Sequence, residues 1–287
     1  MAFLVDTAFE EFHCCINLPG DHRTIANVRK DWIVRRLRPY FNILDSFTTG
    51  SIPRYTALAG HADLDVMLVL HHGEHIEGES PEEVLEHVRL MLGAGVGRVR
   101  RNGQAVTVGF ESWPNVDVVP ASRTYADREK KIVSHYNIPD MHKGIWLPTR
   151  PRDHAASIEA AASLHGPQFR RVIKMVKEWN RRQSVRLQSY HIEVIALKMD
   201  CPFDDYSWAV YKWFDTATEH MWSCYHHGQD VVDYLSGSET LTILSQLSAG
   251  ERIALDAWHL TYNGRGCHEQ AIRCWRSLFG QRFPTYG

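Results

Sequence analysis

The sequence lacks the features that would place it in a membrane or in an oxidising compartment. No apolar run approaches the ~20 residues that a membrane-spanning helix needs. The first residues, MAFLVDTAFEEF, include acids but no basic region of the kind that opens an export signal. The six cysteines form no CxxC pair and show no regular spacing. We therefore expect a cytoplasmic protein with reduced thiols and no membrane partner.

A strong net charge, internal repeats and low-complexity tracts are also missing. The formal net charge is -2 over 287 residues, so binding of a polyanion would depend on local basic clusters rather than on the overall field. Hydrophobic residues make up 44% and charged residues 23%, as in ordinary soluble globular proteins. The length is sufficient for one large domain or two modest ones.

The most informative stretch is residues 49–70, TGSIPRYTALAGHADLDVMLVL. Gly50 and Ser51 precede an expected helical turn, where backbone N–H groups and a hydroxyl can hold phosphate oxygens. The closing apolar run reads as a buried strand, and Asp63 and Asp65 at its start project from one face because they are two residues apart. Carboxylates that close repel each other unless a cation lies between them. The stretch predicts a phosphate site beside a metal site.

A third acid, Asp117, follows in an apolar setting. Alone it could be a turn or cap residue, but with Asp63 and Asp65 upstream a third metal carboxylate is the better interpretation. We expect antiparallel pairing between the strands of Asp65 and Asp117 to bring the acids together. Two Mg²⁺ ions fit such a set, with Mn²⁺ as the alternative. The expected strands are 42–48, 66–70, 105–111 and 116–119.

Amphipathic helices are expected in both halves of the chain. The 21–38 helix has a basic outer face, which we interpret as solvated, with nucleic-acid binding as the open alternative. The segment 138–155, rich in Pro, Gly and charge, is the expected crossing between a catalytic lobe over residues 1–150 and a helical lobe over 151–287. The expected helices are 21–38, 80–92, 168–182, 188–199, 206–224, 238–247, 250–262 and 267–279.

These motifs together resemble a known family. GSIPRYTALAGHADLDVMLVL, VTVGF and NVDVVPA are similar to the nucleotidyltransferase core of the polymerase-β type and, more narrowly, to the bacterial CD-NTases, relatives of cGAS and DncV. The similarity continues through IPDMHKGIWLPTRPRDH, IKMVKEWN, SYHIE and AIRCWRSLFGQRFP, so it spans most of the chain. It implies an α+β fold in which a mixed-sheet nucleotidyltransferase lobe precedes a C-terminal helical lobe.

The resemblance also implies an activity. Such enzymes join nucleoside triphosphates into cyclic di- or trinucleotide second messengers, which a separate effector senses in bacterial anti-phage defence of the CBASS type. Asp63, Asp65 and Asp117 would be the catalytic and metal-binding acids. Gly50 and Ser51 would bind phosphate. A nucleic-acid activator is not expected.

Further substrate-binding residues come from the same resemblance. Lys177 corresponds to the lysine that contacts the triphosphate, and Lys174, one turn earlier on the same helical face, is a weaker candidate. Ser189 and Tyr190 match a serine that contacts phosphate and an aromatic ring that stacks on a base. Tyr55 departs from the glycine that many members have after the arginine, so base preference is not transferred.

Two rival activities would use the same acids. One is a template-independent nucleotidyltransferase that extends RNA 3′ ends, and the other transfers a nucleotide to a small-molecule acceptor. A third rival, a sensor that works only with nucleic acid bound, would use the basic 21–38 helix. Base identity, linkage, ring size and oligomeric state are not encoded in any motif that we recognise.

Overall fold

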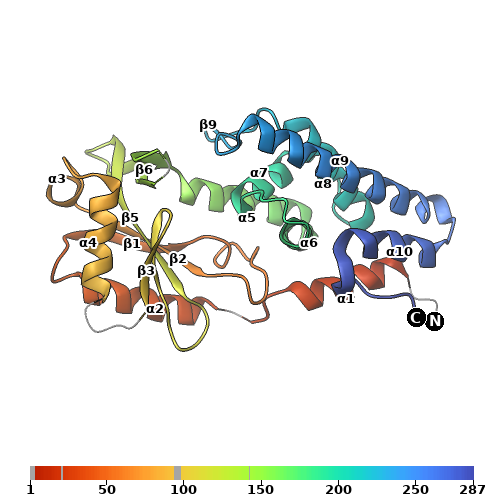
Figure 1. The fold of residues 1–287 in the computed structure, drawn as a ribbon, viewed down its shortest axis with the longest axis horizontal. Helices are drawn as coiled ribbons and strands as arrows, with labels where there is room; N and C mark the ends of the chain where they lie inside the picture. The colour runs from red at the N-terminus through yellow and green to blue at the C-terminus, as the bar shows by residue number, and fades with distance from the viewer. Residues whose placement is uncertain (1–3, 21, 94–97, 142) are drawn as a thin grey trace. The chain divides into compact units, whose positions relative to one another are not determined.

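The computed structural model describes residues 4–20, 22–93, 98–141 and 143–287. The chain folds into two compact units (Figure 1). Gly20–Tyr55 with His61–Ala155 forms what we call the sheet unit, and Met1–Pro19, Thr56–Gly60 and Ala156–Gly287 form the helical unit. These units differ from lobes divided at residue 150, because the N-terminal segment and a short piece around Leu58 pack with the C-terminal helices.

Among the described residues, the sheet unit contains a seven-stranded mixed sheet in the order β1-β2-β5-β4-β3, which β6 and β7 extend from β5. In the part of the chain that the structure describes, β2 and β5 are the one parallel pair. The pairs β1–β2, β3–β4, β4–β5, β5–β6 and β6–β7 are antiparallel. The strands are β1 (Ile43–Thr49), β2 (Leu64–Leu70), β3 (Val99–Asn102), β4 (Ala105–Val108), β5 (Val116–Asp127), β6 (Ile132–Asp140) and β7 (Ile145–Thr149).

The prediction that the strands of Asp65 and Asp117 pair in antiparallel fashion is wrong. Parallel strands need a long crossover, and the chain between β2 and β5 supplies one through the helices α3 (His72–His75) and α4 (Pro81–Gly93) and the β3–β4 hairpin. The hairpin then inserts β4 beside β5. Sequence patterns show where strands lie, but they do not show whether two strands pair in parallel or in antiparallel fashion.

The segment 138–155, expected to be the crossing between the two lobes, contains the end of β6, the whole of β7 and the start of a helix. Pro139 and Pro148 suggested a loop, yet β6 pairs with β7 through both of these residues. Proline is tolerated there because β7 pairs on one side only, and Pro139 lies beyond the residues of β6 that pair with β5. The helix α5 (Pro151–His165) follows directly.

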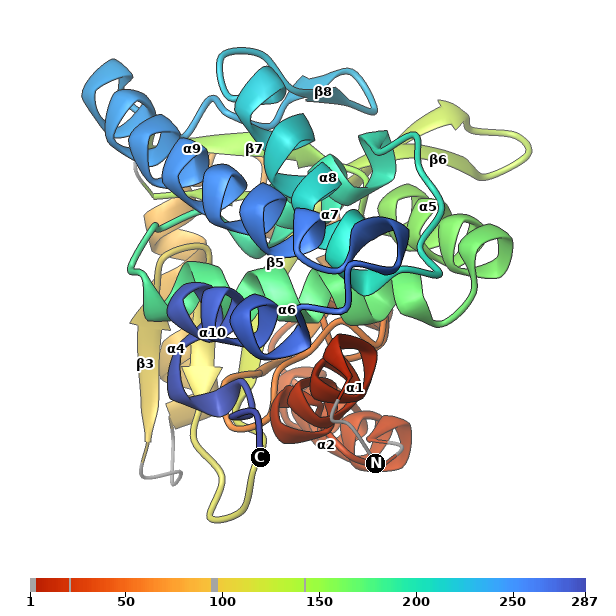
Figure 2. The same ribbon diagram turned by 90° about the vertical axis from the view of Figure 1, so that its right-hand side faces the viewer.

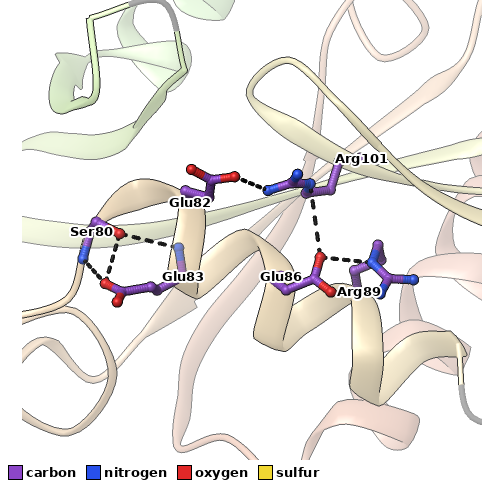
Figure 3. Close-up of polar contacts among 6 residues, drawn as sticks. All are labelled: Ser80, Glu82, Glu83, Glu86, Arg89 and Arg101. Atoms are coloured by element: carbon purple, nitrogen blue, oxygen red, sulfur yellow. Dashed lines mark hydrogen bonds and ion pairs between the residues drawn. The ribbon is translucent and has the colours of Figure 1, made fainter.

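Helix α4 begins at a cap that Ser80 and Glu83 form. The Ser80 hydroxyl donates to a Glu83 carboxylate oxygen at 2.7 Å, and the Glu83 backbone N–H donates to Ser80 Oγ at 3.3 Å (Figure 3). Arg101 on β3 pairs with Glu82 at 2.7 Å and reaches Glu86 at 3.8 Å. Exposed ion pairs of this kind contribute little to stability, so these pairs orient α4 more than they stabilise it.

Helix α2 (Arg23–Leu37) is less amphipathic than its pattern suggested. Val28, which belongs to the apolar repeat of this segment, is 63% exposed, whereas Arg29, one of its basic residues, is buried. The Arg29 guanidinium donates to the carbonyl and hydroxyl oxygens of Ser112, both at 2.8 Å, and lies over the Phe110 ring. Arg29 is therefore a core residue of the sheet unit. Asp21, the first residue of the expected helix, lies outside the described residues.

The helical unit has an aromatic core to which the N-terminal helix α1 contributes. Phe9 of α1 packs edge-on against Trp275, with ring centroids 5.0 Å apart, and α1 lies against α6 and α10 (Figure 2). Besides most of α5, its helices are α1 (Val5–Ile16), α6 (Gln168–Arg182), α7 (Ser189–Lys198), α8 (Tyr206–His220), α9 (Gly237–His259) and α10 (His268–Phe279), with a small hairpin of β8 (Tyr225–His226) and β9 (Gln229–Asp230).

Helix α9 is continuous where two helices, 238–247 and 250–262, were expected. Gly250 lies inside it, and a Cβ at this position would come within 2.6 Å of the Phe214 ring. The glycine is thus a packing residue that lets α8 approach α9 closely. Within the part of the chain that the structure describes, no helix combines the length and the apolar character that a membrane span requires.

Candidate active site

The two strands at the centre of the sheet place two of the predicted acids side by side. Asp65 on β2 and Asp117 on β5 are direct partners in the parallel register. Neighbouring strands lie about 4.8 Å apart, and partners in register project from the same face, so the carboxylates share one surface of the sheet. Asp63 precedes Asp65 by two residues and is exposed, while Asp65 and Asp117 are half-buried.

Gly50 lies against one of these carboxylates. It follows β1 directly and has a φ of +80°, a conformation that glycine adopts without steric cost. A Cβ at this position would lie 1.6 Å from Oδ2 of Asp65. A side chain here would therefore displace the carboxylate, so the glycine next to the acids serves both the turn and the site.

Ser51 begins the turn that the sequence predicted to be helical. Residues 51–55 form a turn rather than a helix, closed by a hydrogen bond from the Tyr55 N–H to the Ile52 carbonyl at 3.0 Å. Tyr55 has a φ of +58°, in the left-handed region that favours glycine. The Arg23 guanidinium lies 4.7 Å from the centre of its ring. The position where the resemblance leads one to expect glycine thus keeps a glycine-like backbone.

Asp117 has an environment that disfavours its charge. Burial raises the pKa of its carboxyl group, and repulsion from Asp63 raises it further, whereas hydrogen bonds and Arg100 lower it. The strongest opposing hydrogen bond comes from Thr107 on β4, whose hydroxyl donates to Asp117 Oδ1 at 2.5 Å. Thr107 is the register partner of Asp117 across the β4–β5 pair. A cation near these acids would relieve the repulsion.

The residues present fit a divalent metal ion. Three aspartates supply hard oxygen donors of the kind that Mg²⁺ takes, and the repulsion of Asp117 by Asp63 is the electrostatic feature that a cation would remove. Over residues 4–20, 22–93, 98–141 and 143–287, no three His, Cys, Asp or Glu side chains are already disposed around one metal position.

The two predicted lysines lie on α6, in the helical unit, and both are buried. Lys177 Nζ pairs with the Glu193 carboxylate at 2.7 Å and donates to the carbonyl and hydroxyl oxygens of Thr56, both at 3.2 Å. The Thr56 hydroxyl in turn donates to Glu193 Oε1 at 2.5 Å. Glu193 on α7 is fully buried. Lys177 is thus already neutralised by a carboxylate of its own unit.

Lys174 lies one turn earlier and lacks such a partner carboxylate in the described part of the chain. Its ammonium donates to Asn17 Oδ1 at 2.6 Å. Burial, with repulsion from Arg170, Arg171 and Lys177, lowers the pKa of Lys174 to about 8. Its charge therefore changes close to neutral pH.

Ser189 and Tyr190 form the first turn of α7, four and three residues before Glu193. Ser189 is exposed, and Tyr190 is half-buried. The Tyr190 ring packs on the small apolar cluster of Val194, Cys224, Val231 and Val232, with the His226 ring 6.1 Å away. The structure thus brings Gly50, Asp63, Asp65 and Asp117 together in one unit. In the other it joins Lys177 to Glu193 of α7, while Lys174 contacts Asn17 instead.

Three residues of these two groups were not predicted from the sequence. Thr107, Thr56 and Glu193 each make a short hydrogen bond to a predicted residue or its partner. A weak signal existed for Glu193, because it is the one acid inside the apolar run IEVIA and a charge there needs a partner. Thr56 and Thr107 gave none, because threonine is ordinary in loops and strands.

The chain matches the Second Messenger Oligonucleotide or Dinucleotide Synthetase (SMODS) domain over residues 4–161, more than half of its length. It belongs to this family. As a SMODS protein, and in agreement with the CD-NTase resemblance of its motifs, it is a nucleotidyltransferase of the cyclic nucleotide synthase class.

The individual relatives have low sequence identity to this chain, but they align with most of its length. A probable cyclic nucleotide synthase of Bacillus cereus (strain VD146) is 24% identical and aligns with 100% of this chain and 99% of its own length. A cyclic AMP-AMP-AMP synthase of an Acinetobacter strain is 24% identical over 83% of this chain and 72% of its own. The structure of CdnC from E. coli MS115-1 with ATP has a TM-score of 0.78 at 18% identity, covering 96% of this chain and 98% of CdnC. The last likeness confirms the predicted α+β fold.

Proposed function

We propose that this SMODS protein joins nucleoside triphosphates into a cyclic di- or trinucleotide by successive metal-dependent nucleotidyl transfers. The product would be a second messenger that a separate effector senses in bacterial anti-phage defence of the CBASS type. The observation that carries the proposal is the register pairing of Asp65 with Asp117 on neighbouring strands. Asp63 is close enough to Asp117 to repel it, and the absence of a side chain at Gly50 leaves room for the Asp65 carboxylate.

Asp63, Asp65 and Asp117 would hold two Mg²⁺ ions, with Mn²⁺ as the alternative. When bound, such ions lower the pKa of the attacking hydroxyl and neutralise the charge of the triphosphate and of the departing pyrophosphate. The chain contributes the positions of the carboxylates, which the β2–β5 register and the Thr107 hydrogen bond fix. Carboxylates held in this way do not need to reorganise during the reaction.

The reaction is a displacement at phosphorus. The oxygen of a ribose hydroxyl forms a bond to the α-phosphorus of a bound triphosphate, the bond to pyrophosphate breaks, and the hydroxyl proton leaves to solvent. A second transfer on the linear intermediate closes the ring. Gly50 and Ser51 would present backbone N–H groups and a hydroxyl to phosphate oxygens.

The helical unit would supply the remaining substrate contacts. Ser189 would contact phosphate, and Tyr190 would stack on a base, an interaction worth ~1–3 kcal/mol. Lys174 is a better candidate than Lys177 for the triphosphate contact, because a phosphate contact by Lys177 would compete with its ion pair to Glu193. Lys174 has a neutral partner, Asn17, and loses less when it turns to an anion.

The test is incubation of the purified protein with all four nucleoside triphosphates and Mg²⁺, followed by phosphatase treatment and mass spectrometry. We expect phosphatase-resistant cyclic products without any primer. Asp63→Ala with Asp65→Ala should abolish every product and keep the circular dichroism spectrum, whereas Asp31→Ala, an exposed acid on α2, should leave product formation unchanged. Products that form only with an RNA primer or a small-molecule acceptor would replace the proposal by one of the two rival transferases.

A further inference from the structure

The sheet unit contains a second candidate site at the other end of the strands that carry the acids. A cavity of about 580 Å³ opens where β2 ends at Leu70 and where β5 runs from Ser122 to Tyr125. Asp65 lies five residues before Leu70, which corresponds to roughly 16 Å along an extended strand. The cavity is therefore separate from the acid cluster although both are built on β2 and β5.

The lining of this cavity is strongly basic. Among the described residues that line it, none is Asp or Glu, while five side chains are cationic or can become so. These are His71, His72, Arg123, Arg128 and Lys131. Such one-sided composition is unusual in a protein with a net charge of -2, and it creates a local positive potential.

The basic groups are only partly satisfied within the protein. The Nε atom of Arg123 is buried and has no hydrogen-bond partner among the described residues. Arg128 and Lys131 are exposed, lie on the loop between β5 and β6, and form no ion pair within the described part of the chain. On the same loop Lys130, which is not part of the lining, pairs with Asp127 at 3.6 Å. His71 also has a partner, Glu74, at 3.3 Å.

We propose that this cavity binds a small phosphate-bearing molecule. Guanidinium groups match the geometry of phosphate oxygens, and a charge-assisted hydrogen bond is about twice as strong as a neutral one. The volume falls in the range of small-molecule sites, ~300–1,000 Å³, which suits a nucleotide or a short polyphosphate. Tyr125 offers a ring at the cavity wall, with the Arg123 guanidinium 5.1 Å from its centre.

The two ends of β2 and β5 carry opposite charge, so the two sites differ in whether they need divalent cations to bind phosphate. The acid cluster repels phosphate unless cations are present, whereas the basic cavity attracts phosphate without them. Binding of a polyphosphate in the absence of divalent ions therefore does not depend on the acids, and Arg128→Gln with Lys131→Gln separates the cavity from Gly50, Ser51 and Lys174. This makes the proposal independent of the catalytic one.

The experiment is calorimetric titration of the full chain with inorganic tripolyphosphate in a buffer containing EDTA. We expect binding that weakens at least roughly tenfold in Arg128→Gln with Lys131→Gln, since each lost charged hydrogen bond is worth about a factor of ten. Both residues are exposed, so the variant should fold. Lys130→Gln is the matched control on the same loop and should leave binding unchanged, as should Asp63→Asn.

A second arm identifies the source of the phosphate. ATP that binds more tightly than tripolyphosphate, with the difference removed by Tyr125→Ala, would indicate a nucleotide; equal binding would indicate the polyphosphate group alone. Absence of binding in EDTA, or binding that survives Arg128→Gln with Lys131→Gln, would overturn the proposal. So would an equal loss of binding in Lys130→Gln, because the effect would then be one of general charge.

Discussion

The acids of the sheet unit and Lys177 of the helical unit lie in opposite electrostatic environments. Asp117 is half-buried and repelled by Asp63, so the folded chain itself disfavours its ionised form. Lys177, by contrast, is buried with Glu193 as its counter-ion and with two hydrogen bonds to Thr56. Asp63 and Asp117 repel each other, whereas the Lys177–Glu193 pair is balanced internally.

This difference separates binding residues from residues that build the fold. A cluster with excess charge gains free energy from an external ion, whereas a balanced buried pair loses free energy when either partner leaves. We therefore expect mutation of the acids to affect activity far more than stability. Mutation of Lys177 should do the reverse, and the following variants test this contrast.

The largest effect is expected for Lys177→Ala. Removing the lysine leaves the fully buried Glu193 without its cation, which costs about 3–5 kcal/mol of the free energy of unfolding. Urea denaturation measures the loss. The double variant Lys177→Met with Glu193→Leu should recover much of it, because an apolar pair of similar volume can replace a buried ion pair.

The control for this prediction is Lys130→Ala. Lys130 is 75% exposed and pairs with Asp127 at 3.6 Å, so its removal should cost less than about 0.5 kcal/mol. If Lys177→Ala cost as little as this control while abolishing product formation, Lys177 would belong with the acids as a binding residue, and the contrast between the two clusters would fail.

A smaller effect is expected for Gly50→Ala. The substitution adds the cost of a positive φ, about 1–2 kcal/mol, and pushes Asp65 away from its position. We expect product formation to fall by roughly 100-fold, the loss typical when one positioned catalytic group moves. Gly60→Ala is the control, because Gly60 also has a positive φ of +72° but a Cβ there would meet nothing within 4 Å. Its effect should be confined to stability.

Much of the acid cluster could be predicted because it depends on local spacing. Two aspartates at i and i+2 before an apolar run fix a strand face, and Gly50 directly after a strand indicates a turn. The parallel direction of β2 and β5 could not be predicted, since the intervening β3–β4 hairpin inserts β4 next to β5 instead of returning the chain to β2.

In the helical unit α6, α7, α8 and α10 could be predicted from their patterns, but α1 and α5 were not among the expected helices, α9 was expected as two, and the polar core was not foreseen. The α6 pattern gave the correct boundaries, Gln168 and Arg182. It could not show that Lys177 and Glu193, on different helices and 16 residues apart, pair inside the core. Likewise α1 and residues 56–60 join this unit through packing over long sequence distances, which no local pattern records.

A moderate, pH-dependent effect is expected for Lys174. Its pKa is lowered to about 8 in the folded chain from 10.5, so between these values the unfolded chain binds more protons. The free energy of unfolding should therefore rise as the pH increases from 8 to 10.5, by up to about 3 kcal/mol for this residue. Denaturation at several pH values measures this rise, and Lys174→Met should remove it. A rise that persists in Lys174→Met would assign it to another group.

The smallest effect is expected for Thr107→Val, which tests how finely the acid cluster is tuned. The hydrogen bond from Thr107 lowers the pKa of Asp117, against burial and Asp63, so its loss lets that pKa rise further. Product formation plotted against pH should then begin at a higher pH while the rate at high pH changes only a few-fold. Stability should change by less than about 1.5 kcal/mol, since valine keeps the volume and only one hydrogen bond is lost.

Thr107→Ser, which keeps the hydroxyl, should restore the original profile. A profile that shifts to lower pH, or not at all, would mean that the ionisation of Asp117 does not limit the reaction, and the acids would then matter as a group rather than one by one.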